Sequence, residues 1–196
     1  MSTPFLIVGL GNPGSRYSET RHNAGFWFLD RLAESCAVRL RTQTRLQSEL
    51  ARCELHGHDC LLAKPTTFMN HSGQAVRAVM DYYGADAASL LVAYDELDLP
   101  PGVARLKQGG GHGGHNGLRD IFRHTADHGF LRLRIGIGHP GSKDAVTPYV
   151  LGRATAEQER MMRDSIADAL AVLPALLRGD LPGAMKALHT VKEDGL

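Results

Sequence analysis

Short apolar runs rich in β-branched residues alternate along this chain with segments in which apolar residues recur at helical spacing. Strands that alternate with helices in this way are typical of α/β proteins, in which helices cover a central sheet. The pattern therefore predicts an α/β fold, a single-domain three-layer sandwich with a mixed, mostly parallel twisted sheet flanked by helices. The strands are expected at residues 5–10, 47–55, 58–63, 89–94, 102–107 and 130–137.

Three helices are predicted by stripes of apolar residues, at 24–33, 75–83 and 162–173. Pro174 is expected to kink or end the last of them, because proline lacks the backbone N–H that a helix needs. A short helix is then expected to restart within the sequence DLPGAMKALH.

Two of the predicted strands are too close together to be parallel. The runs 47–55 and 58–63 are linked at Gly57 and His58, and such a short link favours an antiparallel hairpin. The sheet is therefore expected to be mixed.

Length and composition fit one domain. The chain has 196 residues, of which 43% are hydrophobic, and this is enough to bury one core. We expect the domain to span residues 1–191, with 192–196 as a tail, and we expect the segment 139–153 to be mobile.

Several absences favour a cytoplasmic protein. No apolar run approaches the roughly 18 residues that span a bilayer. The start MSTPFLIVGL lacks the charged and long apolar parts of a secretory signal. An odd number of cysteines suggests free thiols in a reducing cytosol. We interpret these residues as small, buried or half-buried apolar side chains: Cys36, Cys53 and Cys60.

The first predicted strand ends in VGLGNPG, which contains the G-x-G-x-x-G pattern of dinucleotide-binding proteins. That fingerprint requires a helix to open at its third glycine. Here Gly14 is followed by a polar stretch, and the helical pattern begins only near His22. Asp30, at roughly the distance of a ribose-binding acid, lies within that helical pattern. We therefore expect a glycine-rich turn that exposes Asn12 at the carboxyl end of the strand, and a change in NADH fluorescence on mixing would reveal the alternative, a dehydrogenase.

The charge of the chain is unevenly distributed. Residues 101–153 contain eight Lys or Arg against three Asp, a net charge of +5, and the rest of the chain carries −4. A polyanionic partner and a solvated basic face explain this equally well.

Polar residues gather in loops where predicted strands and helices meet. If these loops converge, one crevice holds imidazole, carboxylate and carboxamide groups, a set that suits attack by water. A neutral histidine can accept a proton near pH 7, a carboxylate can fix its tautomer, and asparagine can bind peptide groups or an oxyanion. Taken singly, each asparagine is also explained by a turn or a helix cap. The residues are His22, Asp95, Asn12, Asn70, His115 and Asn116.

Ten histidines raise the question of a metal site, above all His112, His115 and His139. Their spacing among glycines differs from the helical pair of metalloproteases, and no cysteine or acid lies at a useful distance in the sequence. We expect neither a metal nor a cofactor.

Six motifs occur in one order over residues 5–151 and resemble those of bacterial peptidyl-tRNA hydrolases. They are VGLGNPG, RHNAGFW preceded by Tyr17 and Thr20, KPTTFMN with a following SG, DELDLPPG, GGGHGGHNGL and RLRIGIGHPG. The resemblance implies a monomeric, metal-independent esterase that cleaves the ester between a peptide and the 3′-terminal ribose of tRNA. On this resemblance, residues 1–191 form a catalytic domain, and we expect the segment 139–153 to act as its lid.

The resemblance also implies a role for each matching residue. His22 matches the general base, and Asp95 the residue that keeps it in its basic form. Asn12 matches the residue that favours N-blocked substrates. The remaining matches concern the substrate: Asn70 and Asn116 with the peptide and the attacking water, Tyr17 and Phe68 near the acceptor end, His115 among the binding residues, and Lys107, Arg134 and Lys143 as a phosphate clamp.

Two positions depart from the family pattern. His71 stands where an apolar residue is common, which puts a one-histidine pH profile in doubt, and Arg105 stands where some relatives have lysine. A non-catalytic RNA-binding module is the main alternative. Such a module would be expected to offer aromatic stacking platforms, and only Tyr17, Phe68 and Phe130 are available.

Overall fold

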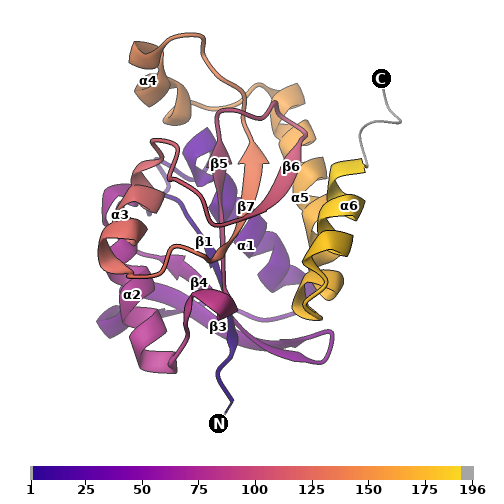
Figure 1. Ribbon diagram of the computed structural model, residues 1–196. Helices are drawn as coiled ribbons and strands as arrows, with labels where there is room; N and C mark the ends of the chain where they lie inside the picture. Colours follow the sequence, from indigo (N-terminus) through magenta and orange to yellow (C-terminus); the bar gives the residue numbers. More distant parts are fainter. Residues whose placement is uncertain (1, 191–196) are drawn as a thin grey trace.

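The computed structural model describes residues 2–190, and the predicted tail 192–196 lies outside them. A seven-stranded sheet runs through the centre of the molecule (Figure 1), with the strand order β2-β3-β4-β1-β5-β7-β6. The strands are β1 (Phe5–Gly9), β2 (Arg41–Gln43), β3 (Ser48–Leu55), β4 (His58–Pro65), β5 (Leu90–Glu96), β6 (Ala104–Gln108) and β7 (Leu131–Gly136).

The sheet is mixed, as predicted. The central strands β4, β1, β5 and β7 pair in parallel, whereas β3 and β6 are antiparallel to their neighbours. Strands β3 and β4 form the expected hairpin, in which Leu55 pairs with His58. The carboxyl ends of the four parallel strands therefore meet at one edge of the sheet, where open α/β folds place their ligands.

Helices cover both faces of the sheet (Figure 1). Helices α1, α5 and α6 share one hydrophobic core with one face, and α2 and α3 share a second core with the other face. The helices are α1 (Ala24–Ser35), α2 (Ser72–Tyr83), α3 (Asn116–His124), α4 (Val146–Val150), α5 (Ala156–Leu177) and α6 (Leu181–Thr190). Five short 3₁₀ helices complete the described chain: η1 (Arg21–Asn23), η2 (Thr44–Leu46), η3 (Met69–His71), η4 (Ala87–Ser89) and η5 (Lys143–Ala145).

The glycines of the VGLGNPG motif let α1 pack closely against the sheet. A Cβ added to Gly9 would lie 2.2 Å from the Gly25 carbonyl oxygen, and a Cβ on Gly11 would lie 2.6 Å from the ring of Phe26. After Gly14 the chain forms turns until η1, so no helix opens at the third glycine. This confirms the expected glycine-rich turn and removes the helix N-terminus that a dinucleotide would need.

The sequence missed one strand, and of the two alternatives expected at Pro174, a kink or a helix end, the end is wrong. Strand β2 was not predicted, because its three residues are all exposed and carry no apolar pattern; it pairs with β3 at the edge of the sheet. Pro174 does not end α5, which continues to Leu177. The missing N–H of Pro174 affects only the last turn, where the Pro174 carbonyl still accepts a hydrogen bond from the backbone N–H of Arg178.

The three cysteines are free, with Cys60 buried and Cys36 and Cys53 half-buried, as predicted. Burial raises the pKa of Cys60 and of Cys53 to about 12, and a hydrogen bond to Cys36 adds to the effect at Cys53. Within residues 2–190, no helix has both the length and the apolar character needed to cross a bilayer.

Candidate active site

A cavity of about 350 Å³ opens at the carboxyl ends of β1 and β5. Five loop or helix-start segments reach it: the turn after β1, η1, η3, the start of α3 and the region of α4. The predicted crevice is therefore formed by the expected loops. Eight of the predicted site residues line it: Asn12, Tyr17, His22, Phe68, Asn70, Asp95, His115 and Asn116.

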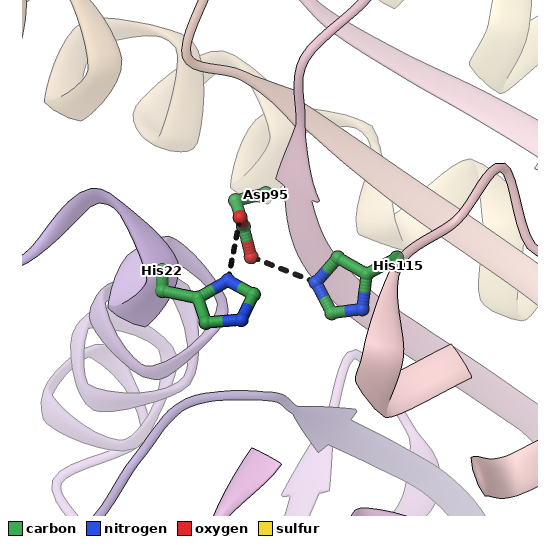
Figure 2. A group of neighbouring side chains, drawn as sticks. All are labelled: His22, Asp95 and His115. Atoms are coloured by element: carbon green, nitrogen blue, oxygen red, sulfur yellow. Dashed lines mark hydrogen bonds and ion pairs between the residues drawn. The ribbon is translucent and has the colours of Figure 1, made fainter. Parts of the chain in front are cut away.

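Asp95 lies between two histidines (Figure 2). Its side chain is almost fully buried near the end of β5. Oδ2 lies 2.8 Å from Nδ1 of His22, and Oδ1 lies 2.9 Å from Nε2 of His115. Each carboxylate oxygen thus has one imidazole partner.

The hydrogen bonds assign a tautomer to each ring. Nδ1 of His115 accepts from the backbone N–H of Leu118 at 3.3 Å, so Nε2 carries the hydrogen that His115 donates to Asp95. Nδ1 of His22 donates to the other oxygen of Asp95. This leaves Nε2 of neutral His22 as an unprotonated acceptor, and no group within residues 2–190 forms a hydrogen bond to it.

The same contacts shift the pKa values of the pair. Burial alone would lower the pKa of His22, but the negative charge and hydrogen bond of Asp95 outweigh it, and the net shift is upward from 6.5. Burial would raise the pKa of Asp95, whereas the two histidines hold that pKa well below its usual range. Asp95 is therefore ionised throughout the neutral range and favours a proton on His22.

Asn12 is held in one orientation. Its Oδ1 accepts from the backbone N–H of Met69 at 2.7 Å. Asn23 binds the Asn12 backbone twice, accepting from its N–H at 2.8 Å and donating to its carbonyl at 2.9 Å. Because Oδ1 is already bonded, the amide NH₂ group of Asn12 is the part left to donate into the cavity.

Asn70 and Asn116 lie on other sides of the cavity, in η3 and at the start of α3. Both residues are exposed, and neither side chain has a hydrogen-bond partner within the described chain. Tyr17 and Phe68 pack edge to face, with ring centroids 6.1 Å apart, and Phe68 is 55% exposed. Together these residues give the cavity free amide groups and an aromatic border.

The segment 139–153 contributes a wall of the cavity through Val146, Thr147, Val150 and Leu151. Arg21 connects this segment to η1, since its Nη1 donates to the carbonyl of Tyr149 at 3.1 Å and its guanidinium lies 3.9 Å from the Tyr149 ring centroid. The predicted lid thus contacts the residue that precedes His22.

Two residues of the predicted phosphate clamp lie on neighbouring strands, and one of them contacts a residue that lines the cavity. Lys107 on β6 and Arg134 on β7 belong to residue pairs that are two positions apart and therefore on the same face of the sheet: Lys107 pairs with Arg132, and Arg105 pairs with Arg134. Arg134 forms an ion pair at 2.7 Å with Glu96, which itself lines the cavity. Lys143 is exposed at the start of η5. None of the three cations lines the cavity itself.

Sequence reasoning missed four residues that shape this site: Arg21, Asn23, Glu96 and Arg132. Arg21 and Asn23 flank His22 within the RHNAG motif, so their position next to the predicted base could have marked them as site residues. The alternation along β7 could have shown that Arg132 shares a face with Arg134.

His22, Asp95 and His115 also form a group whose ligand atoms lie within 4.8 Å of one another, close enough for a metal ion. Of the three histidines that the sequence singled out, His115 belongs to this group, together with an acid that the sequence spacing did not indicate, whereas His112 and His139 do not belong to it. A metal on Nε2 of His115 would displace the hydrogen that this ring donates to Asp95, and the Leu118 N–H would prevent that hydrogen from moving to Nδ1. The geometry fits protons better than a metal.

Comparisons with known proteins agree with one another. The family model described as Peptidyl-tRNA hydrolase matches residues 6–195. The peptidyl-tRNA hydrolase of Halorhodospira halophila is 50% identical over 184 residues, which cover 94% of this chain and 95% of that protein. The Acinetobacter baylyi enzyme is 50% identical and covers 98% and 99%. A crystal structure of peptidyl-tRNA hydrolase from Acinetobacter baumannii has a TM-score of 0.93 at 48% identity, covering 97% of this chain and 96% of the other.

Proposed function

The chain belongs to the peptidyl-tRNA hydrolase family and hydrolyses the ester that joins a peptide to the 3′-terminal ribose of tRNA, and on this premise we propose that His22 is the general base and Asp95 its partner. The observation that carries the proposal is the hydrogen bond from His22 Nδ1 to Asp95, which directs the free Nε2 to a cavity lined by three asparagines.

The reaction begins with a water molecule bonded to Nε2 of His22. As the water oxygen attacks the ester carbonyl carbon, Nε2 takes one of its protons, and Asp95 stabilises the imidazolium that forms. When the tetrahedral intermediate collapses, the bond to the ribose oxygen breaks and the imidazolium returns the proton to that oxygen. The products are a peptide acid and a tRNA with a free 3′-terminal ribose.

His115 holds Asp95 from the other side. Both of its ring nitrogens are engaged within the protein, one with Asp95 and one with the Leu118 N–H. We therefore assign His115 to positioning the carboxylate, which refines the expectation that it binds substrate.

The asparagines bind the peptide next to the ester. The NH₂ group of Asn12 donates to a substrate carbonyl oxygen, since its Oδ1 is already bonded to Met69. Asn70 and Asn116 have both a free donor and a free acceptor, so they can hold a peptide N–H, the attacking water or the developing oxyanion. These uncharged groups require no particular side chain on the peptide.

The same groups explain selection for an N-blocked substrate. In a free aminoacyl ester an ammonium replaces the first peptide amide and would meet the NH₂ donor of Asn12. Burial of that ammonium without a carboxylate partner is unfavourable. Peptidyl-tRNA carries no such charge.

The tRNA lies along the basic strip beside the cavity, with its phosphates near Lys107, Arg134 and Lys143, while Tyr17 and Phe68 contact its acceptor end. The positive charge of residues 101–153 and the position of Arg134 next to Glu96 support this orientation. We assign the enzyme to the cytoplasm, where its substrate is found, as a single-domain monomer in which 139–153 closes over the peptide.

The test is hydrolysis of N-acetyl-aminoacyl-tRNA by the wild type and by His22→Ala, each with and without a chelator of transition metals. His58→Ala is the matched control, because His58 lies on β4 and does not line the cavity. We expect turnover to fall by about two to four orders of magnitude in His22→Ala, and to survive both chelation and the control substitution. Substantial activity in His22→Ala, or loss on chelation, would contradict the mechanism.

A further inference from the structure

Arg132 on β7 is a buried cation without a carboxylate partner. Its exposed fraction is 1%, and no Asp or Glu of the described chain forms an ion pair with it. Instead, Nη1 donates to the carbonyl of Gly111 at 2.5 Å and Nη2 to the carbonyl of Gly110 at 2.6 Å. A buried charge is costly, so its position needs an explanation.

Aromatic rings fix the guanidinium in place. It lies 5.1 Å from the ring centroid of Phe122 and 5.2 Å from that of Phe130, so both rings attract the cation. Its Nε has no hydrogen-bond partner within residues 2–190. The two glycine carbonyls are therefore the main polar partners of Arg132, and the glycine loop is what this side chain holds.

The direction of the two carbonyls determines the direction of the next two N–H groups. All peptide bonds in the described chain are trans, and in a trans peptide the C=O and N–H point in opposite directions. Because the carbonyls of Gly110 and Gly111 point inward to Arg132, the N–H groups of Gly111 and His112 point outward. No group within residues 2–190 accepts either hydrogen.

Gly110 and Gly111 are exposed, His112 is half-buried, and the backbone of this loop needs glycine. Gly109 and Gly110 have φ values of 67° and 91°, which side chains rarely adopt. Successive N–H groups that point to one side of such a loop form an anion-binding concavity. The loop therefore presents two parallel donors to solvent.

Lys107 supplies a positive charge next to these donors. It pairs with Arg132 across β6 and β7, and its side chain reaches over Gly110, where an added Cβ would lie 2.8 Å from the lysine Nζ. The ammonium is thus held beside the loop by the same strand pair that buries Arg132.

We propose that the N–H groups of Gly111 and His112, together with Nζ of Lys107, bind one phosphate group of the tRNA, and that Arg132 is the positioning residue that turns these N–H groups outward. Two backbone donors and an ammonium match the oxygens and charge of a phosphate. The inference rests on the proposed tRNA orientation and adds a backbone receptor to it. The phosphate is either the 5′-terminal group or one within the RNA chain.

The experiment measures the dissociation constant of an acceptor-stem RNA hairpin that ends in CCA, with either a 5′-phosphate or a 5′-hydroxyl, by fluorescence anisotropy. The proteins are the full chain, Arg132→Met, and Arg45→Met as a control that removes one exposed positive charge from η2. We expect Arg132→Met to bind about tenfold more weakly than Arg45→Met. Weakening only with the 5′-phosphate assigns the terminal group, and weakening with both RNAs assigns a phosphate within the chain.

A second pair of variants covers the case in which Arg132→Met does not fold. Gly111→Pro removes one proposed donor, and Gly111→Ala keeps it, with its Cβ entering open space. The dissociation constant of Gly111→Pro should exceed that of Gly111→Ala at least about fivefold. Folded Arg132→Met or Gly111→Pro that binds both RNAs as tightly as its comparison variant would overturn the proposal. Absence of hydrolysis by the wild type would instead contradict the proposed function.

Discussion

Nδ1 of His22 lies 2.8 Å from Oδ2 of Asp95, and this contact determines both the tautomer and the pKa of the proposed base. A protonated His22 cannot accept a proton from water, so activity is lost as the pH falls through the pKa of His22. That pKa is raised above 6.5, chiefly because the charge of Asp95 outweighs burial. The acid limb of the kcat/KM profile should therefore have its midpoint above 6.5.

Asp95→Asn tests the origin of that midpoint. The substitution removes the charge that raises the pKa of His22 and leaves the burial that lowers it, so the acid limb should move to lower pH. Turnover at pH 7.5 should also fall by about two orders of magnitude or more, because an amide does not stabilise the imidazolium. A pH–rate profile for hydrolysis of N-acetyl-aminoacyl-tRNA measures both effects, and an unmoved limb would remove Asp95 from the mechanism.

His115→Ala should reduce kcat more than it changes KM. Oδ1 of Asp95 would lose its hydrogen bond, and the carboxylate would be free to turn away from His22. We expect about a tenfold loss in kcat, since the substitution acts through Asp95. His115→Gln, which keeps an N–H donor, should recover part of the loss. A change confined to KM in steady-state kinetics would show instead that His115 binds substrate directly.

Asn12→Asp should relax the preference for N-blocked substrates. One carboxylate oxygen can still accept from the Met69 N–H, while the other replaces the NH₂ donor and attracts an ammonium. The ratio of kcat/KM for N-acetyl-aminoacyl-tRNA to that for aminoacyl-tRNA should drop at least about tenfold. Equal ratios in Asn12→Asp and the wild type would show that selection lies elsewhere.

The fold was predictable because most elements carry a pattern that burial imposes. Strand β5 is buried through six of its seven residues, and its apolar sequence showed this directly. Strand β2 is exposed on both faces, so nothing in its sequence distinguishes it from a loop; pairing with β3 alone defines it. The helix was expected to end at Pro174 because proline lacks a backbone N–H. That rule does not take into account that Pro174 lies in the last turn of α5, where little of the helix remains to be disrupted.

The site residues also divide into those that the sequence predicted and those that only the tertiary structure reveals. His22 and the asparagines stood out because they occupy polar loops at the ends of predicted strands. The sequence did not predict that His115 bonds to Asp95, because this contact requires His115 to lie next to the end of β5, which is a property of the tertiary structure. Arg132 escaped notice because an arginine in a basic segment is expected at the surface, and its buried position is explained by tertiary contacts with the carbonyls of Gly110 and Gly111 and with two aromatic rings.

Gly25→Ala should destabilise the fold. A Cβ at this position would lie 2.3 Å from the carbonyl oxygen of Ala93 and 2.6 Å from the backbone nitrogen of Leu10, and neither backbone can move without disturbing β5 or the end of β1. Overpacking of this kind costs about 1–3 kcal/mol. Urea denaturation should show a lower midpoint, and a midpoint equal to that of the wild type would mean that α1 can shift away from the sheet.

Two of the three thiols should react slowly with alkylating agents. The thiolate is the reactive form, and a rise in pKa from 9.0 to about 12 at Cys53 and Cys60 reduces its fraction about a thousandfold at neutral pH. Iodoacetamide labelling followed by mass spectrometry should therefore find both sites largely unmodified in the native protein and fully modified in guanidinium chloride. The denatured protein is the control for intrinsic reactivity, because unfolding removes the burial that raises both pKa values. Rapid labelling of Cys60 in the native state would mean that β4 opens often enough to expose its side chain, since Cys60 is fully buried between β3 and β1.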